Sequence, residues 1–119
     1  MAQMHKRVFG LPDETRSFDK GEVRLLTLGG VTFGRATFQP GWKWSTSVKP
    51  VVKTSSCQAP HLAYQISGRL HVVMDDGSET EFVAGDVCQI PPGHDAWVVG
   101  QEPVVTLDIT GMGEYAKPK

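Results

Sequence analysis

The 119-residue sequence lacks several features that would place it at once in a functional class. No apolar run is long enough for a signal peptide or a membrane-spanning helix, so we expect a soluble, cytoplasmic protein without a membrane partner. No basic run is present, and 12 basic residues nearly balance 13 acidic ones, which argues against nucleic acid as a partner. Neither a Gly-x-Ser-x-Gly elbow nor a phosphate-binding loop occurs.

Cysteine is also scarce. Cys57 and Cys88 are too few for a disulfide framework, and we expect both to be free thiols in a reducing cytosol. Cys88 shares an apolar strand pattern with Ile90 and is interpreted as a small core residue. Cys57 is followed four residues later by His61, and a thiol and an imidazole at this spacing raise the question of a metal site.

Helical periodicity is missing, whereas 13 glycines and 8 prolines favour many short strands. The polar segment 12–20 is expected to hold at most one helical turn, and Pro50 argues against a central strand within 42–56. Strand patterns recur about every ten residues, which is typical of an all-β sandwich or barrel. The expected strands are 22–28, 31–39, 61–67, 69–74, 79–83, 86–90, 96–100 and 104–110. The polar tail from 111 is expected to be loose.

The segment GDVCQIPPGHDAW resembles the second conserved motif of the cupin superfamily, a glycine and five residues followed by Pro-x-Gly. Gly85, Pro91 and Gly93 match this motif, and YQISG, ending at Gly68, resembles the end of the first motif. The resemblance implies an all-β, jelly-roll (double-stranded β-helix) barrel, with residues 1–119 forming one cupin domain whose core spans about 30–110. The mouth of such a barrel commonly holds a small molecule.

The family's metal-ligand positions carry unusual residues in this sequence. Counting back from the glycine of the first motif places His61 at the glutamate position, Cys57 at the second histidine and Ser55 at the first. The histidine of the second motif falls on Ala96. His94 lies two residues earlier, and residues two apart on a strand point to the same side.

Cys57, His61 and His94 are therefore candidate ligands of a divalent transition metal, with zinc, nickel, iron or manganese as candidates. Iron-dependent oxygenation is the less suitable use, because a facial triad needs a carboxylate and its position holds His61. The alternative is a pocket that kept its shape without a metal. The sequence favours that alternative, because only two of the four metal-ligand positions of the family carry a residue that can ligate a metal.

Side chains alternate along 61–67, so placing the candidate ligand His61 on the inward face assigns the other residues to two faces. The inward face has His61, Ala63 and Gln65, and the outward face has Leu62, Tyr64 and Ile66. Hydrophobicity alone would choose the opposite orientation. Cover of the outward face by the N-terminal strands or by a second subunit resolves the conflict, as would a bulge near Ala63. We favour cover, and hence a homodimer.

Four residues are predicted to bind a small organic ligand: Trp44, His61, Gln65 and His94. Trp44 follows a Pro-Gly turn and could stack on a flat ligand. Three hypotheses for function stay open. The chain is a ligand-binding cupin with or without a metal, a metal-dependent isomerase or lyase whose metal polarises a carbonyl, or a structural module with a filled pocket. The sequence does not decide whether it is an enzyme.

Overall fold

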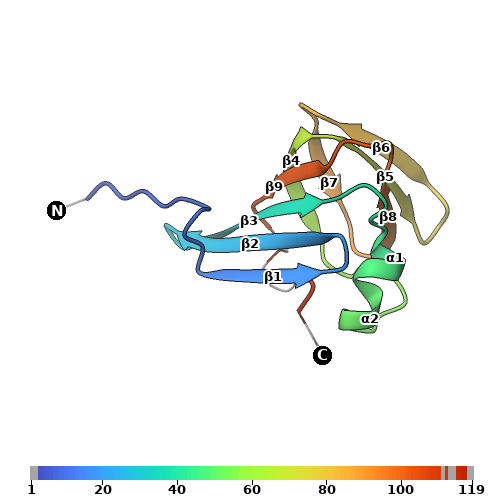
Figure 1. Ribbon diagram of the computed structural model, residues 1–119, viewed down its shortest axis with the longest axis horizontal. Coiled ribbons are helices and arrows are strands. Elements are labelled where there is room, and N and C mark those ends of the chain that lie inside the picture. The colour runs from blue at the N-terminus through green and yellow to red at the C-terminus, as the bar shows by residue number, and fades with distance from the viewer. Residues whose placement is uncertain (1–2, 111, 113–114, 118–119) are drawn as a thin grey trace.

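The computed structural model describes residues 3–110, 112 and 115–117, which form nine β-strands and two short helices (Figure 1). The strands are β1 Glu14–Phe18, β2 Gly21–Leu28, β3 Val31–Phe38, β4 His61–Ser67, β5 Arg69–Met74, β6 Glu79–Val83, β7 Val87–Ile90, β8 His94–Val98 and β9 Val104–Asp108. The helices are α1 Trp44–Ser47 and α2 Lys49–Val52. All eight strands expected from the sequence are present, three with the expected ends and five with ends shifted by one or two residues.

The strands form two antiparallel sheets, six-stranded in the order β1-β2-β3-β9-β4-β7 and three-stranded in the order β6-β5-β8. Inward-facing side chains of both sheets pack into a shared core, with Val23 and Phe38 from the first sheet and Leu70 and Val72 from the second. Such alternation of buried and exposed residues explains why the strand pattern could be recognised in the sequence. The architecture is the all-β jelly roll that was predicted.

The expectation of a helical turn within 12–20 is wrong, because this segment contains strand β1, which pairs with β2 from Glu14↔Leu25 to Phe18↔Gly21. β1 is the edge strand of its sheet and is largely exposed, so it lacks the apolar alternation that marks a buried strand. Within 42–56 the chain forms α1 and α2 instead of a strand, and Pro50 lies in the first turn of α2, where a missing N–H is tolerated. No helix in the described part of the chain is long and apolar enough to cross a membrane.

The expectation of a loose C-terminal tail is wrong for its described residues, because Met112, Tyr115 and Ala116 are buried. The guanidinium of Arg16 donates to the carbonyl oxygens of Met112 and Tyr115 at 3.3 and 2.8 Å. The Tyr115 ring packs edge-on against Phe18, with 6.1 Å between ring centroids. The expectation fails because the tail is polar on average, whereas Met112, Tyr115 and Ala116 pack in the core. The rest of the predicted tail, residues 111, 113–114 and 118–119, lies outside the described residues.

Strand β4 has the predicted orientation, with the face of His61 and Gln65 directed inward. His61 and Gln65 are buried, whereas Leu62, Tyr64 and Ile66 are 38, 48 and 44 % exposed. The N-terminal strands therefore leave this face uncovered. A β-bulge does interrupt the pairing of β4 with β9, but it lies between Gln65 and Ser67 rather than near Ala63, so it does not reverse the orientation of the preceding residues.

Candidate metal and ligand site

The backbone brings Cys57 next to the start of β8. The N–H of Cys57 donates to the carbonyl of His94 at 2.7 Å, and the N–H of Gly93 donates to the carbonyl of Cys57 at the same distance. Gly93 has a φ of +93°, and a Cβ at this position would lie 2.8 Å from Oδ2 of Asp75. The glycine of the Pro-x-Gly motif therefore allows the tight turn that places His94 beside Cys57.

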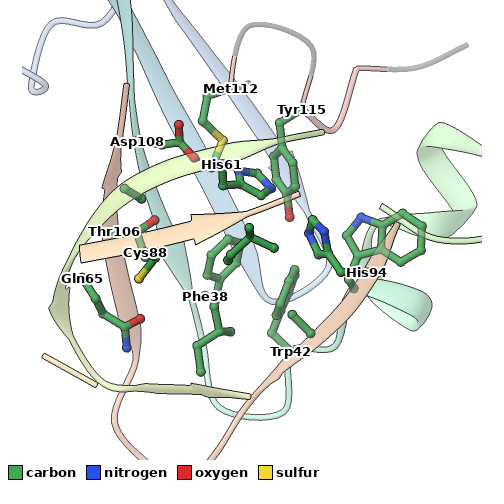
Figure 2. A pocket seen from close by; sticks show the side chains of 15 residues that line it. Phe38, Trp42, His61, Gln65, Cys88, His94, Thr106, Asp108, Met112 and Tyr115 are labelled. Atoms are coloured by element: carbon green, nitrogen blue, oxygen red, sulfur yellow. Dashed lines mark hydrogen bonds and ion pairs between the residues drawn. The ribbon is translucent and has the colours of Figure 1, made fainter. Parts of the chain in front are cut away.

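The three predicted metal ligands converge. The ligating atoms of Cys57, His61 and His94 all lie within 4.8 Å of one another. Sγ of Cys57 is 3.9 Å from Nε2 of His61, and the two imidazole ring centroids are 5.3 Å apart. Figure 2 shows both imidazoles at one end of the pocket. His94 thus supplies the third donor. It lies two residues before Ala96, which occupies the position of the family's histidine and is buried but has no ligating atom.

Hydrogen bonds fix the tautomer of both imidazoles. Nδ1 of His61 is 2.7 Å from Oδ2 of Asp108, and Nδ1 of His94 is 2.8 Å from the carbonyl oxygen of Pro91. A carboxylate and a carbonyl only accept, so each Nδ1 carries the proton and donates it. Each Nε2 is then left with a lone pair. A histidine that ligates a metal through one nitrogen is commonly oriented in this way through the other.

Burial keeps the side chains of Cys57 and His94 uncharged when no metal is bound. Desolvation raises the pKa of the Cys57 thiol to about 11, helped by the nearby carboxylates of Asp95 and Asp108. Desolvation lowers the pKa of His94 to about 4, so its imidazole is neutral at neutral pH. A neutral imidazole can ligate immediately, whereas the thiol must first lose its proton.

The site opens into a pocket between the two sheets with a cavity volume of about 40 Å³. A single water needs about 10–15 Å³ on this scale, so the cavity has room for about three waters or a molecule of similar size. All four predicted ligand-binding residues line it, namely Trp44, His61, Gln65 and His94. Most of the remaining wall is apolar or aromatic: Phe38, Trp42, Ala63, Leu70, Cys88, Ile90, Ala96, Met112 and Tyr115, with Thr106 and Asp108 as further polar groups. Ligand binding by these residues stays a prediction.

Sequence reasoning missed two prominent residues of the site. Asp108, which is fully buried, accepts from the backbone N–H of Thr110 at 2.7 Å besides holding His61. Its signal was available, because an aspartate in the apolar run VVTLDIT has the inward parity of Val104 and Thr106. Tyr115 had no such signal. Its ring centroid is 5.5 Å from that of His61, and its hydroxyl points toward the two imidazoles (Figure 2).

Both cysteines are free and buried, as expected, but they differ in position. Cys57 belongs to the cluster of three donors, whereas Cys88 packs in the core from β7 and lines the pocket farther along. Among the other tryptophans, Trp42 lines the pocket together with Trp44, whereas Trp97 stacks on His71 at 4.8 Å between ring centroids.

No protein-family model and no curated protein matches the sequence. Solved structures do match. A structural-genomics protein of unknown function from Rhizobium leguminosarum bv. viciae 3841 is 20% identical, with a TM-score of 0.64 over 99% of this chain and 100% of that one. A cupin 2 conserved barrel domain protein from Salinispora arenicola CNS-205 is 16% identical, with a TM-score of 0.60 over 91% and 87%.

An oxalate decarboxylase from Lactobacillus farciminis, in a formate complex, is 19% identical with a TM-score of 0.59. The match covers 89% of this chain but 31% of the decarboxylase, so the likeness concerns one part of a longer protein. At these identities the comparisons establish the fold and carry no activity. Together with the two antiparallel sheets and the buried pocket between them, they show that this chain has the fold of the cupin superfamily.

Proposed function

We propose that the chain binds a soft divalent metal ion, best zinc, through Cys57, His61 and His94, and holds a small organic molecule beside it. The observation that carries this proposal is the pair of fixed tautomers. Both Nδ1 atoms are occupied by acceptors, so both imidazoles present Nε2 to the cluster that contains Sγ of Cys57. One thiolate and two imidazoles are a donor set that suits zinc better than manganese, which prefers oxygen.

The charges support the same proposal. A divalent ion brings two positive charges, and the thiolate of Cys57 and the buried carboxylate of Asp108 supply two negative ones. A bound metal would therefore balance the charges of these two groups. It would also offset the high pKa of the buried thiol, because a coordinating thiol is deprotonated outright.

Three protein donors leave a position open in a tetrahedral site, which is the arrangement of zinc sites that receive a water or a substrate. When bound, the metal would supply Lewis-acid polarisation of a ligand oxygen. The protein contributes a largely apolar pocket around it, and the Tyr115 hydroxyl points toward the same end (Figure 2). Binding of a small molecule next to a metal is the function that this geometry supports, whether or not a reaction follows.

Elemental analysis tests the proposal, on protein purified without a histidine tag and then titrated with zinc. We expect about one equivalent of zinc to be bound, His61→Ala to abolish stoichiometric binding, and Cys57→Ser to weaken it strongly. His71→Ala is the matched control, because His71 lies on β5 outside the cluster and should leave binding unchanged. Less than about a tenth of an equivalent after addition of zinc or nickel would refute the metal site and favour the metal-free pocket.

A further inference from the structure

The pocket contains one hydrogen-bond acceptor and one donor without a partner. Among the described residues, Oε1 of Gln65 and Nε1 of Trp42 are buried side-chain atoms with no hydrogen bond. Both residues line the pocket, and Figure 2 shows the Gln65 carboxamide oxygen directed toward its interior. A buried polar atom without a partner is unfavourable, so each of these atoms is a place where a ligand group can gain a hydrogen bond.

The orientation of the Gln65 amide is fixed by its neighbours. Its Nε2 donates to the carbonyl oxygens of Gly68 and Phe82 at 2.8 and 2.9 Å. Both partners only accept, so rotating the amide by half a turn would bring an oxygen against two oxygens. Oε1 is thus held as an acceptor facing the pocket, and only a donor can satisfy it.

The charge of the pocket restricts the ligand further. No lysine or arginine belongs to the described residues that line it, whereas the buried Asp108 does. An anion would therefore enter an apolar cavity without a cationic partner and close to a carboxylate, at a high desolvation cost.

We infer that the ligand is a small neutral molecule that donates a hydrogen bond to Oε1 of Gln65, with a primary carboxamide as the matching chemical class. Its N–H would satisfy Oε1 of Gln65, and its carbonyl could accept from a donor in the wall such as the unpaired indole N–H of Trp42. The cavity of about 40 Å³ limits the buried part to a few non-hydrogen atoms. The inference rests on the proposed function in assuming that this pocket binds a small molecule, but it does not require the metal.

Three probes of nearly equal shape test this assignment: propionamide, butanone and propionate. Butanone keeps the carbonyl but lacks the N–H donor, and propionate replaces the amide by an anion. Each is titrated into the full-length protein, with EDTA and separately with zinc, while amide and indole N–H signals are followed by NMR. We expect millimolar binding of propionamide, with affinity at least about tenfold above that of butanone and of propionate in EDTA, because both leave the Gln65 acceptor unpaired.

A substitution at Gln65 assigns the preference to its oxygen. In Gln65→Met the preference for propionamide over butanone should fall to within about twofold, because the acceptor is gone. The matched control is Gln89→Met on β7, whose side chain is exposed and which should retain the full preference. If Gln65→Met does not fold, the comparison of the three probes on the unaltered chain still decides.

Equal affinities for propionamide and butanone, or tighter binding of propionate in EDTA, would overturn the assignment while leaving a small-molecule pocket in place. No binding of any probe at about 100 mM would overturn it as well, because even a millimolar ligand would then be saturating. The zinc titration is read separately. A protein that binds zinc but shows no amide preference therefore refutes this inference alone. A protein that prefers the amide but binds no zinc refutes only the metal site.

Discussion

Nδ1 of His61 lies 2.7 Å from Oδ2 of Asp108, and both side chains are at least nine-tenths buried. The two residues come from neighbouring strands, β4 and β9, in which Asp108 pairs with Ala63, so the backbone register alone brings them together. The carboxylate holds the imidazole with Nε2 toward Cys57 and makes that nitrogen a stronger donor. Asp108 thereby belongs to the proposed metal site although it does not reach the metal.

Asp108→Asn should lower zinc affinity by about 10- to 100-fold without changing the stoichiometry, because the orienting carboxylate is lost while all three donors remain. Competition with a chromophoric chelator measures this affinity. Asp76→Asn is the matched control, since Asp76 only caps a turn by accepting from Ser78. Unchanged zinc affinity in Asp108→Asn would show that the carboxylate does not orient a ligand.

Zinc binding at pH 8 should release about one proton per protein, because the Cys57 thiol has a pKa of about 11 and must ionise to coordinate. Calorimetry in two buffers of different ionisation enthalpy measures the number released. Cys57→Ser should bind weakly with almost no release, whereas Cys88→Ser should behave like the unaltered chain. Zinc binding without proton release would exclude Cys57 as a ligand.

Acid should destabilise the metal-free fold through His94. Its pKa is about 4 in the folded state against an ordinary value of 6.5, so the unfolded chain takes up the proton first as pH falls. The contribution of the neutral His94 side chain to the free energy of unfolding is fully present above about pH 6.5. It is lost progressively down to about pH 4, by up to about 3 kcal/mol. Urea unfolding in EDTA across this range measures the slope.

His94→Asn should flatten this dependence, because the amide can still donate to the Pro91 carbonyl but does not titrate. His71→Asn should keep the original slope, since His71 stacks on Trp97 and does not belong to the cluster of Cys57, His61 and His94. If the free energy of unfolding depends on pH in the same way for the unaltered chain and His94→Asn, the acid sensitivity belongs to other groups.

The sequence predicted the parts of the site that depend on strand parity and on short motifs. Side chains alternate with a period of two, so fixing His61 as inward also fixed Gln65, and the Pro-x-Gly turn located His94. The convergence of Cys57 with His94 could not be predicted in this way, because it depends on a backbone bridge outside the regular strands. Tyr115 was missed for a similar reason, since its position is set by packing against Phe18 and a hydrogen bond from Arg16 to its carbonyl.

The hairpin between β5 and β6 contains Gly77, whose φ is +91°. A Cβ at this position would meet nothing within 4 Å, so any cost of substitution comes from backbone strain alone. Gly77→Val should lower the free energy of unfolding by about 1 kcal/mol or more. Gly10→Val is the control, because Gly10 also has open space but has no positive φ. Equal stabilities of the two variants would mean that the hairpin relaxes to another turn.

The outward face of β4 leads to the last prediction, that the protein is a homodimer in solution. Leu62, Tyr64 and Ile66 are exposed on this face, and Val87, paired with Tyr64 on the edge strand β7, is 74 % exposed. Apolar side chains that gather on one side of a sheet commonly mark an interaction surface, and strand β7 also leaves backbone groups unpaired at the sheet edge.

Sedimentation at micromolar concentration should give twice the chain mass, and Tyr64→Glu should give the monomer because association would bury its charge. Tyr115→Phe, which changes a buried tyrosine in the pocket, should leave the dimer intact. A monomer for the unaltered chain would contradict the prediction, and a dimer that survives Tyr64→Glu would place the interface elsewhere.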